Sequence, residues 1–101
     1  MAISKNYLNK IAEAIIENRE ARVQCDIDLT GLHDARKSVC KALAQKAIRT
    51  DDKLRREVVS VVASIDLIIR QTNQIHHTIL CEMDELKHKY AVLESTLTKE
   101  A

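Results

Sequence analysis

Residues that interrupt helices are almost missing from this sequence. Its 101 residues include no proline and a single glycine, Gly31. Because proline and glycine mark the turns between strands, their scarcity argues against a sheet architecture. Trp and Phe are absent, and there are two tyrosines, Tyr7 and Tyr90. The sequence therefore predicts one helical domain at most, with a core built from Ile, Leu, Val and Ala.

Long hydrophobic runs are also lacking. No stretch approaches the roughly 20 apolar residues that a membrane-spanning helix needs. Charged side chains, among them Lys5, Lys10 and Glu13, interrupt the N-terminal segment where a secretory signal has a continuous apolar block. The hydrophobic fraction of 46% is nevertheless too high for intrinsic disorder. We therefore predict a folded chain without a membrane span.

Paired cysteines and catalytic motifs are missing as well. Cys25, Cys40 and Cys81 are odd in number and widely spaced, which favours reduced thiols and a cytoplasmic location. His77 and Cys81 are four residues apart on one helical face, but no CxxC or HExxH spacing accompanies them. The Glu-x-x-His element of di-iron bundles occurs once, at Glu85–His88. We predict no enzymatic activity and no metal or other cofactor.

What the sequence does contain is helical periodicity, most clearly in its second half. Residues at alternating spacings of three and four form a seam with a single polar member, Thr72. Its members are Leu54, Val58, Val61, Ile65, Ile68, Thr72, Ile75, Ile79, Met83, Leu86, Tyr90, Leu93 and Leu97. So narrow a stripe predicts a helix over about 53–97 that packs against another helix. Two successive steps of four at Ile75, Ile79 and Met83 predict looser packing near His76 and His77.

A second seam predicts another helix over about 5–48, followed by a turn over about 49–52. Its members are Leu8, Ile11, Ile15, Asn18, Arg22, Cys25, Leu29, Leu32, Arg36, Val39 and Leu43. Gly31 leaves two alternatives open: one continuous or gently kinked helix, or a break that makes three helices. The predicted fold class is all-α, a long antiparallel helical hairpin.

Antiparallel pairing around Thr50 brings together residues whose numbers sum to about 101. Arg36 then faces Asp66. Polar residues at seam positions specify register and partner at some cost in stability, and we assign that role to Asn18, Arg22 and Arg36, with Asp66 as a partner. The alternative is that these side chains face a groove that binds a ligand or a partner helix.

Additional apolar residues beside the seams predict that the hairpin associates. A hairpin of two helices covers one stripe on each helix, so a second hairpin is the simplest cover, giving a dimeric four-helix bundle or a mixed bundle with another helical protein. The predicted interface residues are Val58, Val62, Ile65, Ile69, Ile16 and Val23. The predicted function is protein–protein interaction, as a small adaptor, assembly subunit, chaperone or regulator.

The region around the predicted turn is basic, which provides an alternative function. Between Arg36 and Arg56 eight basic residues face two acidic ones, a net charge of +6, although the whole chain carries +1. The candidates for anion contact are Lys46, Arg49, Lys53, Arg55 and Arg56. A nucleic-acid-binding accessory protein would use such a patch. Aromatic stacking platforms and a compact helix-turn-helix are absent, so this alternative is not favoured.

One short motif suggests a second alternative. Tyr90-Ala-Val-Leu-Glu94 fits the Tyr-x-x-x-Asp/Glu pattern found near the C-terminus of WXG100 proteins. In this motif, its length and its predicted hairpin, the chain resembles that family, which implies a small secreted helical hairpin. The Trp-x-Gly turn of the family is replaced by the segment 48–52.

Overall fold

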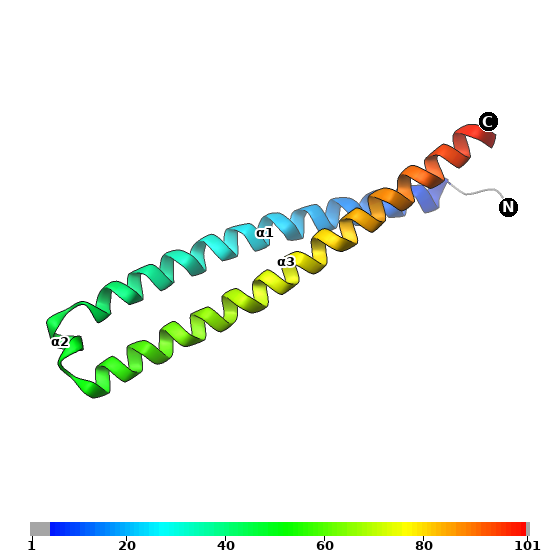
Figure 1. The fold of residues 1–101 in the computed structure, drawn as a ribbon. Helices are drawn as coiled ribbons and strands as arrows, with labels where there is room; N and C mark the ends of the chain where they lie inside the picture. Colours follow the sequence, from blue (N-terminus) through cyan, green and yellow to red (C-terminus); the bar gives the residue numbers. More distant parts are fainter. Residues whose placement is uncertain (1–4, 101) are drawn as a thin grey trace. The chain divides into compact units, whose positions relative to one another are not determined.

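The computed structural model describes residues 5–100, and they form three helices and no strand. The helices are α1 (Lys5–Leu43), α2 (Lys46–Arg49) and α3 (Asp52–Glu100) (Figure 1). The fold class is therefore all-α with the connectivity of a helical hairpin, as the two seams predict. Within the described part of the chain, no helix is apolar enough over a sufficient length to cross a membrane.

The connection between the two long helices differs from the predicted one. α1 ends at Leu43 rather than near residue 48, and Gln45 then adopts an extended conformation with φ −71° and ψ 133°. The single turn α2 follows, between the end of α1 and the start of α3 (Figure 1). Packed helices lie about 8–10 Å apart, so the chain needs a segment that crosses this distance. The predicted four-residue turn is replaced by residues 44–51, which include α2.

Asp51 determines where α3 begins. Its Oδ1 accepts a hydrogen bond from the backbone N–H of Leu54 at 3.1 Å, and its carbonyl accepts one from Arg55 at 2.9 Å. This is the N-cap arrangement that satisfies an otherwise unpaired donor in the first turn. α3 therefore begins at Asp52 and continues without interruption to Glu100.

Gly31 lies inside α1, so the continuous helix is the alternative that the structure adopts. The hydroxyl of Thr30 donates to the carbonyl of Asp26 at 3.0 Å instead of capping a new helix. A Cβ atom added at Gly31 would meet nothing within 4 Å. Packing within this chain therefore does not require a glycine at this position.

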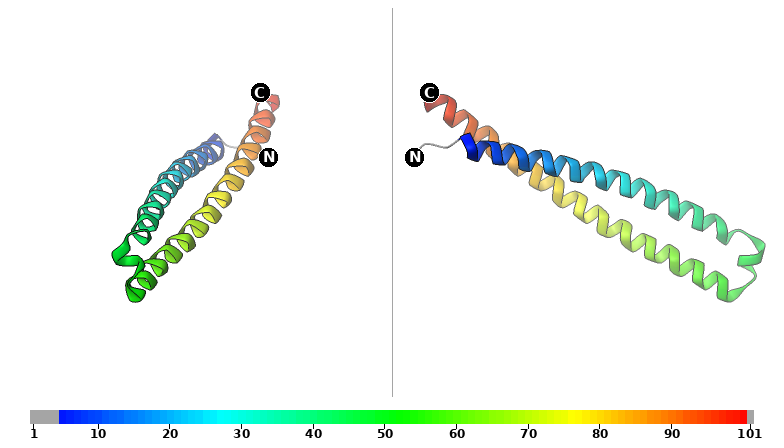
Figure 2. Two further views of the ribbon diagram at one scale, coloured as in Figure 1. Left: turned by 60° about the vertical axis from the view of Figure 1, so that its left-hand side comes forward. Right: turned by 180° about the vertical axis from the view of Figure 1, so that it is seen from behind.

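The chain divides into two compact units. Unit 1 combines Met1–Gln24 with His76–Ala101, of which residues 5–24 and 76–100 are described, and unit 2 is Cys25–Ile75. Unit 2 contains the last part of α1, the helix α2 and the first part of α3, and α1 and α3 run side by side through it (Figure 2). Buried apolar residues are few in both units: Leu8, Ile11 and Met83 in unit 1, and Cys25 and Ile69 in unit 2.

The seam predicted for α1 is confirmed by burial, with one exception. All members except Arg22 are buried or half-buried in the structure. Arg22 is exposed, and Ala21 beside it is half-buried. An arginine placed there would have to lose much of its hydration, and the alanine beside it covers the same surface at no such cost.

The seam on α3 is different from the predicted one over its first half. The buried and half-buried members are Val58, Val62, Ile65, Ile69, Thr72, His76, Ile79, Met83, Leu86, Tyr90, Leu93 and Leu97. Their spacing alternates between four and three without a slip. His76 occupies the seam position predicted for Ile75, and Ile75 is 56% exposed. A regular heptad spacing keeps one stripe of the helix facing its neighbour. His76 keeps this spacing, so it is covered in place of the more hydrophobic Ile75.

Candidate interaction surface

The α3 residues predicted to contact a second chain lie in the seam against α1. Val58, Val62 and Ile65 are half-buried, and Ile69 is 9% exposed. Their contact with a second chain stays a prediction, because seam residues of a hairpin can also face the core of a four-helix bundle. Ile16 and Val23, in unit 1, are 52% and 50% exposed, and their contact with a partner stays a prediction.

The apolar residues left exposed on α3 in unit 2 include a regular row, which we call the aliphatic row. Its members are Leu54, Val61, Ile68 and Ile75, spaced seven residues apart and between 42% and 56% exposed. The last three each immediately precede a seam residue, and Leu54 is one heptad before Val61. The row therefore runs along one side of the seam. A seven-residue repeat of large aliphatic side chains is typical of a helix that packs against another helix.

Small residues occupy the corresponding side of α1, and we call them the small-residue row. Gly31, Ala35, Ser38 and Ala42 each immediately precede a seam residue of α1. In an antiparallel pair, the residues that precede the two seams lie on the same face. A groove lined by Asp28, Gly31 and Leu32 from α1 and by Ile68 and Thr72 from α3 agrees with this placement.

The two rows together form what we call the apolar face of unit 2. Asp28 and Glu57 are the charged residues that precede seam positions within its span. Large aliphatic side chains thus stand on one side of the face and very small ones on the other. The large side chains form a ridge and the small ones a shallow groove, and helices pack by fitting ridges into grooves.

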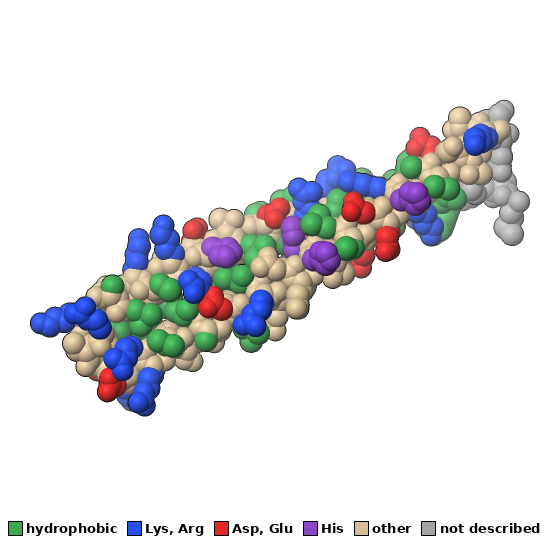
Figure 3. Space-filling view, in the orientation of Figure 1, with side chains coloured by type: hydrophobic (Ala, Val, Ile, Leu, Met, Phe, Trp, Pro, Cys, Tyr) green, Lys and Arg blue, Asp and Glu red, His purple; other side chains and the backbone are tan. Residues whose placement is uncertain are grey.

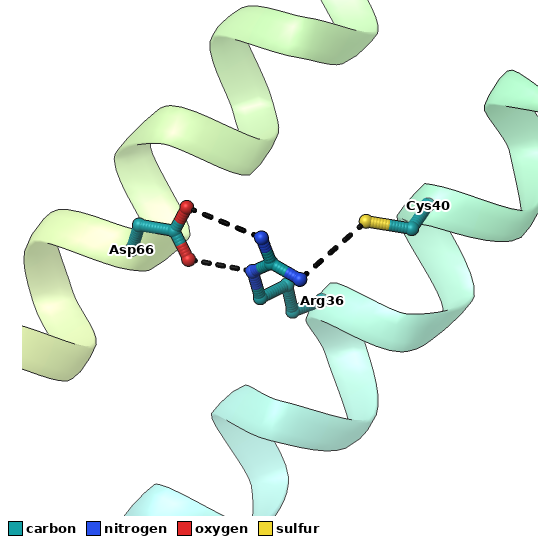
Figure 4. Close-up of polar contacts among 3 residues, drawn as sticks. All are labelled: Arg36, Cys40 and Asp66. Atoms are coloured by element: carbon teal, nitrogen blue, oxygen red, sulfur yellow. Dashed lines mark hydrogen bonds and ion pairs between the residues drawn. The ribbon is translucent and has the colours of Figure 1, made fainter.

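The opposite face of unit 2 carries an ion pair between the two helices. Arg36 Nε donates to Asp66 Oδ1 at 2.6 Å, and Nη2 lies 3.5 Å from Oδ2 (Figure 4). Nη1 of the same guanidinium lies 3.8 Å from the Sγ of Cys40. The hydrogen bond to Asp66, and then the attraction of its charge, raise the pKa of Arg36 above its already strongly basic ordinary value. The predicted pairing of Arg36 with Asp66 is therefore confirmed.

The other polar residues assigned to register are arranged differently. The side-chain amide of Asn18 donates to the carbonyl of Ala14 in the same helix at 3.0 Å. Arg22 is exposed. Their role in register or partner choice stays a prediction, whereas Arg36 and Asp66 join α1 to α3 directly.

Basic side chains gather around the turn of unit 2, as Figure 3 shows at the end that carries α2. The five candidates for anion contact, Lys46, Arg49, Lys53, Arg55 and Arg56, are all exposed. Arg55 is already engaged, because its Nη2 lies 2.8 Å from Asp52 Oδ1 and its Nη1 donates to the carbonyl of Arg49 at 3.4 Å. The turn therefore presents several cations to solvent, with Arg55 partly neutralised.

The possible metal ligands remain a single pair. Sγ of Cys81 lies 3.7 Å from Nε2 of His77, and both side chains are exposed. Among residues 5–100 there is no group of three or more His, Cys, Asp or Glu side chains that could hold a metal ion. Unit 1 also contains a cation–π contact that the sequence did not indicate, with Lys89 Nζ 5.4 Å from the centre of the Tyr7 ring.

Comparison of the chain with protein-family models, curated proteins and solved structures finds no match. The resemblance to WXG100 hairpins therefore rests on length, helical connectivity and the spacing of Tyr90 and Glu94. Secretion of the chain stays a prediction.

Proposed function

We propose that this protein is an interaction module that works by packing its helices against another helical chain, as an adaptor, assembly subunit, chaperone or regulator. The observation that carries the proposal is the aliphatic row, four large side chains in a heptad repeat that remain 42–56% exposed. Monomeric soluble proteins rarely leave large contiguous apolar patches open, and such patches commonly mark protein interaction sites.

The small core of the chain supports the same proposal. Among the residues that the structure describes, five apolar residues are buried and no large side chain is below 2% exposed. A pair of helices covers one stripe on each helix, so the remaining apolar residues need cover from outside. We place the protein in the cytoplasm, since Cys25, Cys40 and Cys81 are all free thiols, as a reducing compartment would keep them.

The test uses the aliphatic row and a matched control. Val61→Glu with Ile68→Glu places two carboxylates on the apolar face, whereas Val59→Glu with Leu67→Glu makes the same change at residues that are 51% and 50% exposed elsewhere on α3. We expect the first variant to lose its helical partner, whether another protein or this chain itself, and the control to retain it. A helical wild-type monomer that retains no partner in sedimentation and affinity purification would contradict the proposal.

The basic turn supports a second candidate function, contact with a polyanion such as nucleic acid. The specific observation is the group of exposed cations around α2. Replacing Lys53 and Arg56 with Gln should weaken binding to duplex DNA or RNA and reduce its dependence on salt concentration, because fewer counterions are released. Replacing Lys87 and Lys89 of unit 1 is the matched control. Absence of binding at low salt would eliminate this candidate.

A further inference from the structure

We infer that the partner of the apolar face is a second copy of this chain, bound antiparallel about a two-fold axis that lies across the helices of unit 2. This inference rests on the proposed function and specifies its partner. In this arrangement α3 packs on α3 of the second copy and α1 on α1, with the two turns at opposite ends of the paired units.

The aliphatic row is complementary to itself when it is reversed. Equal spacing of seven residues means that Val61 of one copy meets Ile68 of the other while Leu54 meets Ile75. All four side chains are then covered by the same four from the second copy. An isologous two-fold interface requires this kind of surface, in which one patch serves both partners.

The small-residue row allows the second pair of helices to approach. When the axis passes between Val61 and Ile68, the middle of the α1 row, at Ser38, lies close to the same axis. Ala35 of one copy then lies near Ala42 of the other.

The charges of unit 2 favour the antiparallel orientation over the parallel one. Residues 36–66 carry eight basic and four acidic groups, a net charge of +4, whereas residues 25–35 and 67–75 carry three acidic groups and one basic group, a net charge of −2. Antiparallel pairing places the basic half of each copy along the acidic half of the other. Parallel pairing would bring the two basic turns together, and like charges repel.

Sedimentation of the full chain tests the self-association. We expect the wild type to be a dimer at micromolar concentration, and we expect V61E/I68E to raise the dissociation constant about a hundredfold or more, because the carboxylates would be buried without partners. The V59E/L67E control should remain a dimer. Circular dichroism of each variant establishes that the helices persist.

Crosslinking tests the arrangement independently of those variants. In a background with Cys25, Cys40 and Cys81 replaced by Ala, Ser64→Cys lies on the apolar face, one residue before seam residue Ile65, close to the inferred axis. It should form a covalent dimer with a short bifunctional maleimide. Ala63→Cys, on the opposite face, should not. The parallel arrangement would instead join a Ser64→Cys chain to a Ser38→Cys chain in a mixture of the two single variants, with no link from Ser64→Cys alone.

The outcomes separate this inference from the proposed function. A helical wild-type monomer at tens of micromolar overturns self-association, and binding of a different helical protein through the same face would still uphold the proposed function. A dimer that survives V61E/I68E, or that is not linked by Ser64→Cys, overturns the assigned face or orientation and also leaves the proposed function standing. If V61E/I68E fails to fold, the crosslink alone decides.

Discussion

At the scale of single residues, Arg36 and Asp66 join α1 to α3 in unit 2. A guanidinium that meets both oxygens of one carboxylate prefers a planar approach, so sliding one helix along the other by a turn would separate the groups. Both side chains are about 40% exposed, and pairs that remain in water contribute little to stability. We therefore expect the pair to contribute to alignment of the helices more than to the free energy of unfolding.

Asp66→Asn should therefore lower the melting temperature only slightly, by about 5 °C or less at fixed protein concentration. The pKa of Arg36 is raised in the folded chain, so its contribution to stability is fully present below the ordinary arginine pKa and is lost only as pH rises beyond it. The effect of the substitution should consequently be constant from neutral to moderately alkaline pH. Thermal melts at several pH values check this, with Asp34→Asn, an exposed acid on α1, as control. A large effect that varies across this range would show that the pair is not the cause.

Ile69 tests which stripe of α3 faces α1. Because this side chain is 9% exposed, Ile69→Ala removes buried methyl groups and should lower the free energy of unfolding by about 2–3 kcal/mol. Leu67→Ala, at a side chain that is 50% exposed, should cost less than about 1 kcal/mol. Denaturant titrations of both variants give the comparison. Equal losses would contradict the seam described for α3.

At the scale of the elements, most of α1 and α3 follows from the sequence, because the seam residues recur at the period of a helix. Burial of the α1 seam was predictable to within one residue, Arg22. The first half of α3 was not, since both the aliphatic row and the true seam are apolar there. The sequence does contain one signal: the spacing of four and three stays regular if the seam passes through His76 and becomes irregular if it passes through Ile75. This regularity decides which stripe is covered, even though Ile75 is the more hydrophobic residue.

The turn was less predictable than the helices. Residues 46–49 have helical character on their own, so the sequence gives no sign that α1 stops at Leu43 before α2 begins. The ion pair was predictable from antiparallel register, whereas the contact of Lys89 with Tyr7 depends on side-chain directions that periodicity alone does not define.

The start of α3 provides a prediction at this scale. Asp51→Ala removes the acceptor for the Leu54 N–H and should lower the free energy of unfolding by about 1 kcal/mol. Asp51→Asn retains an oxygen acceptor and should restore most of this loss. Thermal or denaturant unfolding, followed by helical signal, measures both. Equal destabilisation by Ala and Asn would assign the effect to the lost charge near the helix dipole rather than to the cap.

At the scale of the whole molecule, the stability of each chain should depend on how many chains surround it. If two copies cover each other's aliphatic rows, folding and association are linked, and dilution favours the unfolded chain. With an unfolding enthalpy of about 0.7 kcal/mol per residue, the melting temperature of such a dimer should rise by about 3–4 °C for each tenfold increase in concentration. A self-sufficient monomer would show no such dependence.

Calorimetry of three proteins over a hundredfold range of concentration makes this quantitative. The wild type and V59E/L67E should show the same slope of melting temperature against the logarithm of concentration, because the control changes residues outside the apolar face. V61E/I68E should melt at a lower temperature that is independent of concentration, since its unfolding no longer separates two chains. A wild-type slope of zero, with a cooperative transition, would mean that α1 and α3 suffice for each other, and that the exposed aliphatic row does not stabilise the fold through a second copy.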